Sequence, residues 1–333
     1  MIRSLLSADY PRSRLVAAIL LAIVLALALA PFLFPGARSL AVAAKILVFV
    51  LLVASYDLLL GYTGIVSFAH TMFFGIGAYG VAIASTRMGP GWDAVALGVA
   101  VALVLSALLA LVIGLFSLRV KAIFFAMITL AVAAAFQTLA SQLSEFTGGE
   151  DGLTFKLPEL LQPSFELFED TVFGVSIDGR LLSYYLLFVA VLVLFLVLLR
   201  IVNSPFGRVL QAIRENDFRA EALGYRTVVF RTLSTVLAAM FATAAGALLA
   251  IWLRYNGPDT TLSFEIMLDT LLIVVIGGMG TMYGAVIGSA LFVFAQSYLQ
   301  DLMGWISTGL EGVPLVAALF SPDRWLLWLG VLF

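Results

Sequence analysis

Long apolar runs recur along this chain, and they restrict its fold more than any other feature. The hydrocarbon core of a bilayer is about 30 Å thick, so a helix needs about 20 apolar residues to cross it. Lipid cannot hydrogen-bond an exposed backbone, which leaves helices and closed barrels as the only spanning structures. The runs lack the alternation of a barrel strand. We therefore predict an all-α, polytopic transmembrane helical bundle with about 9–10 spans and glycine-interrupted helices.

The predicted spans follow the runs closely. They cover residues 15–34, 40–60, 66–86, 93–118, 122–143, 182–202, 229–253, 265–280 and 283–300, with a tenth beginning near Trp325. The first run resembles a secretory signal, but at about 20 residues it is too long for a signal core and is predicted to remain as a span. The final run, Trp325 to Phe333, is about half a span long. We expect that the natural C-terminus is missing; the alternative is a last helix that ends inside the protein.

The composition supports a membrane protein. Hydrophobic residues make up 63% of the chain and charged residues 11%, with a mean hydropathy of +1.12. In soluble domains roughly a quarter of the residues are charged. Cysteine is absent, which excludes disulfides and thiolate metal sites. A single histidine, His70, argues against a histidine-based metal site.

The basic residues of the short loops predict the orientation of the spans. Those residues are Arg3, Arg12 and Arg14 before the first span, and Arg119 and Lys121 after the fourth. They place the N-terminus in the cytoplasm. The arginine-bearing loop at residues 203–230 then also faces the cytoplasm after two more crossings. By the same count, the acidic loop at residues 144–181 lies outside, in the periplasm.

The 203–230 loop is the longest polar interruption that carries an excess of arginine. Ser204 and Pro205 predict a helix start, because serine can cap free N–H groups and proline fits the first helical position. A break is expected near Asn216 and Asp217, and Gly224 suits the end of the second turn. The simplest interpretation is a solvated loop whose arginines only set the topology.

The same loop resembles the cytoplasmic coupling loop of ABC importer permeases, whose short helix docks into a groove on the ATP-hydrolysing subunit. The matching residues are Gly207, Arg208, Gln211, Ala212, Arg214, Glu215, Asn216, Arg219, Ala220, Glu221, Ala222, Leu223 and Gly224. Three further stretches resemble the LivM-type permease of bacterial branched-chain amino acid importers. They are Tyr56–Gly80, Phe146–Leu153 and Met267–Gly288.

The resemblance implies a single transmembrane permease domain over residues 1–333 in the bacterial inner membrane. It further implies a second, LivH-like permease subunit, two ATP-binding subunits and a periplasmic solute-binding protein as partners. A P-loop requires Gly-Lys before Ser or Thr, and none of the three lysines follows a glycine. ATP and Mg are therefore expected on the partner subunits, with no cofactor and no nucleic acid bound by this chain. Branched-chain or related small amino acids are the expected cargo.

Ionisable and glycine residues within the spans are the candidates for a translocation path, because buried charge in a membrane is costly. The candidates are Asp57, Gly61, Tyr62, Ser67, His70, Asp269, Gly277 and Gly278. Ser67 and His70 are three residues apart and are expected on one helix face. Lys45 is expected to reach the interface. For each ionisable group, a bond between neighbouring helices is the alternative. The glycines fit either broken helices or close helix packing.

Three other functions remain open from the sequence. A urea or short-chain amide permease of the same kind would share these motifs. An ion-coupled secondary transporter would require a carboxylate relay, for which only Asp57 and Asp269 are available. A membrane enzyme would require a clustered nucleophile, base or metal site, and the chain offers little to build one.

Overall fold

A computed structural model gives the fold of the chain. It describes residues 13–34, 36–116, 122–166 and 177–309, together with residues 321, 324, 327, 328 and 330. Several predicted features lie outside the described residues: Arg3, Arg12, Arg119 and Lys121, and the start of the tenth span at Trp325.

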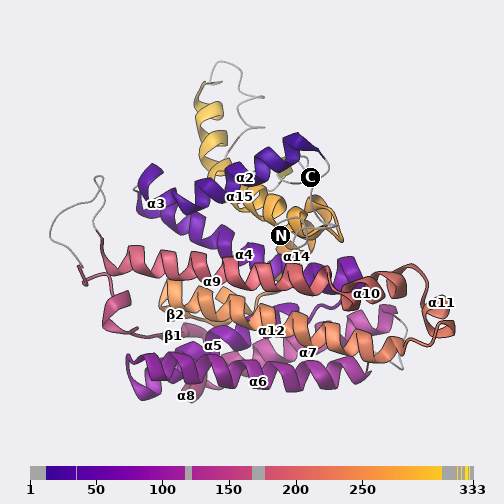
Figure 1. Ribbon diagram of the computed structural model, residues 1–333. Helices are drawn as coiled ribbons and strands as arrows, with labels where there is room; N and C mark the ends of the chain where they lie inside the picture. Colours follow the sequence, from indigo (N-terminus) through magenta and orange to yellow (C-terminus); the bar gives the residue numbers. More distant parts are fainter. Residues whose placement is uncertain are drawn as a thin grey trace.

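The first predicted span, residues 15–34, is divided at Leu29 between two helices, α2 (Arg14–Ala28) and α3 (Ala30–Leu33), and each of the other complete predicted spans corresponds to one helix (Figure 1). The helices are α2 (Arg14–Ala28), α4 (Ala37–Thr63), α5 (His70–Met88), α6 (Trp92–Phe116), α7 (Ala122–Gln142), α9 (Gly179–Val202), α12 (Thr227–Leu253), α14 (Phe264–Gly277) and α15 (Met282–Gly309). In the described part of the chain, seven segments have the length and apolar composition of a membrane span. The all-α, polytopic bundle is thereby confirmed.

Short elements connect these helices. They are α3 (Ala30–Leu33), α8 (Ser144–Thr147), η1 (Gly149–Asp151), β1 (Leu153–Thr154), η2 (Glu159–Leu161), α10 (Pro205–Glu215), α11 (Asp217–Ala222), β2 (Tyr255–Asn256) and α13 (Pro258–Thr261). The two strands pair antiparallel, with Leu153 opposite Asn256. The described part of the acidic loop at residues 144–181 thus contains short helices as well as the strand β1.

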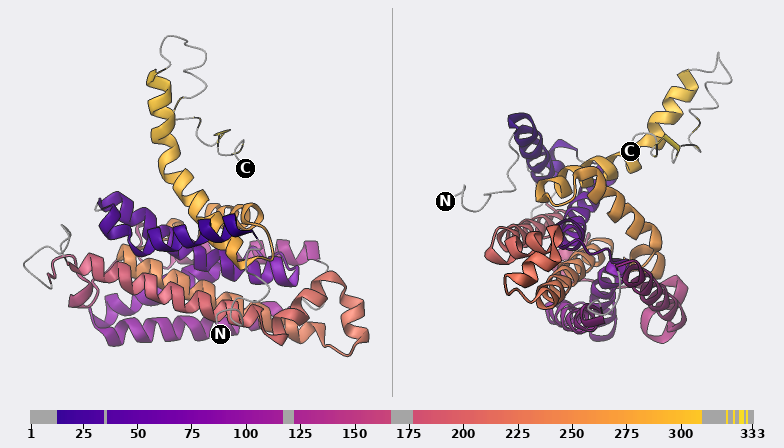
Figure 2. Two further views of the ribbon diagram at one scale, coloured as in Figure 1. Left: turned by 45° about the horizontal axis from the view of Figure 1, so that its top comes forward. Right: turned by 90° about the vertical axis from the view of Figure 1, so that its right-hand side faces the viewer.

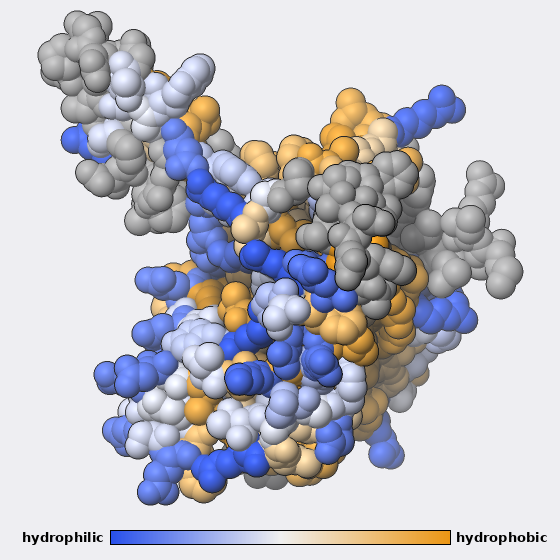
Figure 3. Space-filling view, turned by 90° about the vertical axis from the view of Figure 1, so that its left-hand side faces the viewer, coloured by the Kyte–Doolittle hydropathy of each residue, from blue (hydrophilic) through white to orange (hydrophobic). Residues whose placement is uncertain are grey.

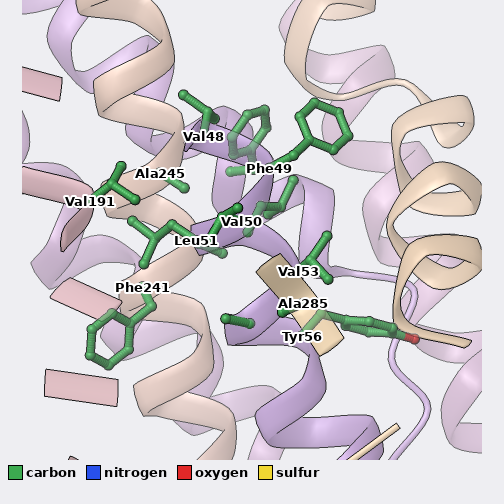
Figure 4. Packing of buried hydrophobic residues seen from close by; sticks show 14 of the residues in the cluster. Val48, Phe49, Val50, Leu51, Val53, Tyr56, Val191, Phe241, Ala245 and Ala285 are labelled. Carbon is green, nitrogen blue, oxygen red and sulfur yellow. The ribbon is translucent and has the colours of Figure 1, made fainter. Parts of the chain in front are cut away.

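Helix α4 lies at the centre of the bundle. Figure 4 shows Leu51 and Val53 of α4 with side chains from three other helices: Val191 of α9 and Phe241 and Ala245 of α12 on the Leu51 side, and Ala285 of α15 on the Val53 side. Leu51 and Ala245 are fully buried. Lipid tails are as apolar as these side chains, so close packing between helices stabilises such a core more than exclusion from water does.

Glycines bring the backbones of α5 and α12 into contact. A Cβ atom added at Gly77 would collide with the carbonyl group of Thr243, and one at Gly246 would collide with that of Phe74. Small residues at a helix interface permit such an approach in membranes. Gly77 and Gly246 therefore contribute to helix packing.

The two long polar loops lie at opposite ends of the bundle, as the predicted topology requires. Helices α10 and α11 lie at one end, here called the α10 end, and β1 and β2 lie at the other, here called the β1 end (Figure 1). Figure 3 views the β1 end, where hydrophilic residues gather, while hydrophobic residues cover much of the flank. A hydrophilic end and a hydrophobic flank are expected for a bundle that crosses a bilayer with both ends in water.

The third span differs from its prediction. Helix α5 begins at His70 instead of residue 66, and Gly64 ends α4 in the left-handed conformation with φ +74°. Residues Gly64–Ala69 are not helical. The expectation that Ser67 and His70 share one helix face is therefore wrong, because Ser67 precedes the helix. Helix α15 also differs, since it extends to Gly309 and its last turns leave the bundle (Figure 2).

Candidate functional site

Helices α10 and α11 form the predicted coupling segment. Helix α10 begins at Pro205 as predicted, but the Ser204 hydroxyl does not cap it. That hydroxyl instead donates to the Ile201 carbonyl at 2.6 Å, because the preceding helix α9 also leaves its last carbonyls free. The break at Asn216 is confirmed: its side chain accepts a hydrogen bond from the Arg219 N–H at 2.9 Å and starts α11.

One face of α10 packs against the bundle. Leu210 and Ile213 are buried, and Phe206 stacks on Phe230 at 5.6 Å between ring centroids. Gly207 permits a close approach, because a Cβ atom there would collide with the Val202 carbonyl of α9. The opposite face of α10 is exposed. The exposed residues of α10 among the predicted coupling residues are Arg208, Gln211, Ala212, Arg214 and Glu215.

Helix α11 is fixed at both ends. Gly224 adopts φ +91°, and its N–H donates to the Glu221 carbonyl while the Tyr225 N–H donates to the Ala220 carbonyl. This pair of bonds is a Schellman motif, which satisfies the last carbonyls of a helix. The Thr227 hydroxyl donates to Glu221 at 2.8 Å, so α11 is also attached to the first residue of α12.

A polar cleft of about 360 Å³ lies between α10 and α11. Its lining combines six residues that match the coupling loop, Ala212, Glu215, Asn216, Arg219, Ala220 and Leu223, with Tyr225. Beside it, the Phe218 side chain is 86% exposed and that of Leu223 72% exposed. The interpretation of the sequence missed Phe218 as a site residue. The sequence did carry a signal for it: Phe218 is an aromatic residue in a polar loop, directly after the predicted helix break.

Arg214 points away from this cleft toward the bundle. Its guanidinium donates a hydrogen bond to the Gly61 carbonyl near the end of α4. Gly280, in the turn between α14 and α15, donates its N–H to Asp57 Oδ1 at 2.9 Å. We call these four residues the inner junction. It brings together predicted coupling and path residues, although Asp57 binds protein backbone here.

Residues Gly64–Ala69 form a re-entrant segment between α4 and α5. His70 bonds to Ser55, eight residues before the end of α4, so the segment returns about 12 Å along that helix. The Phe68 N–H donates to Thr129 of α7 at 3.0 Å. The segment is partly exposed. Non-helical backbone at membrane depth is tolerated only where protein covers it or water reaches it.

His70 is buried at the start of α5, with 1% exposure. Its Nε2 lies 2.8 Å from the Ser55 hydroxyl, which donates its own hydrogen to the Leu52 carbonyl. The His70 ring centroid lies 5.1 Å from that of Tyr56. Ser67, also buried, accepts from the Ala69 N–H at 3.4 Å. These residues stabilise the contact of α4 with the re-entrant segment.

A second set of hydrogen-bonded polar side chains lies between α4, α14 and α15. Lys45 donates to Gln296 Oε1 at 2.8 Å, and Gln296 donates to Asp269 at 3.4 Å. Lys45 therefore does not follow the expectation that it reaches the interface; it bonds within the bundle. The interpretation of the sequence missed Gln296, although an amide in the apolar run at residues 283–300 was a visible signal.

The remaining candidates lie in the α14–α15 hairpin and in α4. A Cβ atom added at Gly277 would collide with the Gly284 carbonyl, so the two helices touch there. Gly278 follows α14 with φ +97°. Tyr62 is fully buried in α4. Among the described residues, no group of three or more His, Asp or Glu side chains is arranged to hold a metal ion.

Comparison with known proteins identifies the family. Residues 38–319 match the family described as branched-chain amino acid transport system, permease component. The chain belongs to this permease family. Its match begins in the first turn of α4 and includes the α10–α11 cleft, the inner junction and the re-entrant segment, whereas α2 and α3 precede it.

Individual members of this permease family show the same relationship. LivM of Salmonella typhimurium, a high-affinity branched-chain amino acid transport system permease protein, is 26% identical over 299 residues, 86% of this chain and 69% of the relative. LivM of Escherichia coli is 25% identical over 296 residues, 85% and 68% of the two chains. BraD of Pseudomonas aeruginosa is 26% identical over 264 residues, 77% and 83%. No solved structure matches the chain significantly.

Proposed function

We propose that this chain is the transmembrane permease subunit of an ATP-binding-cassette importer that moves branched-chain or related small amino acids into the cytoplasm. The α10 end faces the cytoplasm of a bacterium and the β1 end faces the periplasm, with the bundle in the inner membrane. A periplasmic binding protein delivers the solute, and two separate ATP-binding subunits supply the energy. A second, LivH-like permease subunit completes the membrane core.

The observation that carries this proposal is the α10–α11 surface. Phe218 and Leu223 are exposed at an end of the bundle that lies in water, next to a polar cleft. Large apolar side chains exposed together commonly mark a protein interaction site. Aromatic and arginine side chains, such as those of Phe218 and Arg219, are enriched at the energetic centre of such interfaces.

The fixed geometry of this surface supports the same proposal. Helix α10 is buried along one face by Leu210 and Ile213, and α11 is attached to α12 through Glu221 and Thr227. Asp217 also forms an ion pair with Arg231 of α12 at 3.0 Å. A force applied to the exposed face would therefore reach the membrane helices. A flexible loop would absorb such a motion.

ATP hydrolysis is assigned to other subunits, since none of the chain's lysines has the Gly-Lys context of a P-loop. ATP and Mg bind to those subunits in this proposal. The family match supports transport of branched-chain amino acids, because its description names that cargo. The relatives whose names include that cargo cover most of this chain.

Purification with co-expressed neighbours tests the proposal. The chain is isolated in mild detergent, and the ATPase subunits that accompany it are identified and reconstituted with it in liposomes. Candidate binding proteins, loaded with leucine, urea or acetamide, are then added. We expect ATPase subunits to co-purify and leucine-loaded binding protein to stimulate hydrolysis and uptake. Uptake driven by an ion gradient without ATPase subunits contradicts the proposal. If only the binding protein loaded with urea or acetamide stimulates hydrolysis and uptake, the cargo is urea or a short-chain amide.

A further inference from the structure

Three stretches that are far apart in the chain meet at the inner junction. Arg214 belongs to α10, Asp57 and Gly61 belong to α4, and Gly280 belongs to the turn between α14 and α15. The two hydrogen bonds that join them connect residues 153 and 223 positions apart. Long-range polar contacts of this kind fix the relative positions of three elements.

The Arg214 side chain of α10 reaches the other two parts of the junction. Its guanidinium donates to the Gly61 carbonyl. A Cβ atom added at Gly280 would lie 2.9 Å from Arg214 Nη1, and one added at Gly64 would lie 3.3 Å from Arg214 Cγ. Gly64 is the first residue of the re-entrant segment. Arg214 thus lies where α10, the end of α4 and the α14–α15 turn come together.

The chemistry of this position favours arginine. The last four carbonyls of a helix lack partners within the helix, and Gly61 is in the last turn of α4. That turn carries no basic residue of its own. A cation at a helix C-terminus is favourable because the terminal carbonyls carry partial negative charge. Arg214 supplies that cation from a different element.

The glycines make the junction too close for other residues. A Cβ atom at Gly61 would collide with the Gly280 nitrogen and with Asp57 Oδ1. Gly280 itself adopts φ +81°, a conformation that costs little only for glycine. The α14–α15 turn is therefore in direct backbone contact with α4. Moving one of these elements without the other would break the bond between Gly280 and Asp57.

We propose that Arg214 is a positioning residue that transmits motion of α10 to the ends of α4 and of the α14–α15 hairpin. This inference rests on the proposed function. Arg214 is exposed as well, but it differs from the other exposed residues of α10 by its bond to α4. Those other residues contact the ATPase subunit, whereas Arg214 connects the surface to the membrane helices. Through Gly64, the same motion reaches the re-entrant segment, which adjoins the buried His70.

The test measures solute moved per ATP hydrolysed in the fully assembled importer. Arg214→Ala is compared with wild type and with Arg226→Ala, which removes an exposed arginine that lies outside the cleft and the junction. We expect Arg214→Ala to retain ATPase subunits and stimulated hydrolysis within about twofold of wild type, while the ratio of uptake to hydrolysis falls about tenfold, or about 1.4 kcal/mol. Arg226→Ala should keep the wild-type ratio.

The outcomes separate this inference from the proposed function. If wild type binds no ATPase subunit, the proposed function fails. If wild type transports but Arg214→Ala loses hydrolysis and uptake in parallel, or loses neither, the role of Arg214 in transmission is wrong. Should Arg214→Ala not assemble, Arg214→Gln answers the same question, because it keeps a shorter N–H donor without charge. A wild-type ratio in assembled Arg214→Gln also overturns the inference.

Discussion

At the scale of single residues, the re-entrant segment gives the sharpest test of where water enters the bundle. Val66 is partly exposed in non-helical backbone, and such backbone at membrane depth requires protein cover or water. We expect Val66→Cys to react with a water-soluble thiosulfonate in the assembled importer, because the thiolate forms only in water. The chain has no native cysteine to interfere.

Two matched positions control this experiment. Leu105 of α6 is 44% exposed on the flank of the bundle, and Leu52 of α4 is fully buried. Neither Leu105→Cys nor Leu52→Cys should react, since lipid covers the first and protein covers the second. Equal labelling of Val66→Cys and Leu105→Cys would show that exposure in the structure does not report contact with water at this depth.

Gly61 provides a second prediction at this scale. In an open helix, Gly→Ala gains about 1 kcal/mol of stability. Here the added Cβ would collide with the Gly280 backbone, and overpacking usually costs about 1–3 kcal/mol. We therefore expect Gly61→Ala to lower the melting temperature of the purified permease. Leu60→Ala, at the partly buried neighbouring position, should lower it less; a higher melting temperature for Gly61→Ala would rule out the close contact.

Individual side chains were the least predictable part of the site. The sequence identified Asp57, His70 and Asp269 as unusual, because ionisable groups in spans are rare. It could not identify their partners, since Gly280, Ser55 and Gln296 are 223, 15 and 27 residues away. Such pairings depend on how the helices pack, and the packing is not a local property of the sequence.

At the scale of elements, the α10–α11 segment followed its sequence closely. It starts at Pro205 as predicted, although without a side-chain cap, and its break at Asn216 and its end at Gly224 are set by local hydrogen bonds. The re-entrant segment was not predicted, because contacts with distant parts of the chain determine its conformation. Residues 66–69 are apolar enough for a helix but are not helical, and their contacts, such as that of Phe68 with Thr129, come from a distant helix.

Phe218 carries the prediction that belongs to this element. Its side chain is 86% exposed, so Phe218→Ser should leave the fold of the permease unchanged. If Phe218 enters the ATPase subunit, truncation at such an anchor costs about 2 kcal/mol or more, which weakens binding about 30-fold. The measurement is the affinity of purified ATPase subunit for the permease in nanodiscs. Phe218→Leu is the control that keeps an apolar side chain, and unchanged binding of Phe218→Ser would remove this residue from the interface.

At the scale of the whole molecule, the spans and the ends of the bundle were predictable because the bilayer imposes them. A span must be long and apolar, so its position can be read from hydropathy alone. The orientation depends on a weaker rule, the excess of basic residues in cytoplasmic loops. Arg119 and Lys121, which contribute to that rule, lie outside the described residues. The direction of the bundle therefore requires its own experiment.

The absence of cysteine makes that experiment direct. Glu159 begins η2, which follows β1 in the chain, and Arg226 lies between α11 and α12. Both residues are exposed, and each can be replaced by a single cysteine. A membrane-impermeant maleimide applied to cells with a permeable outer membrane should label Glu159→Cys at once. It should label Arg226→Cys only after the inner membrane is opened, while the unsubstituted chain gives no signal in either case. The reverse pattern would place α10 and α11 in the periplasm, where no ATP-binding subunit could reach them, and would refute the proposed coupling even if the fold were correct.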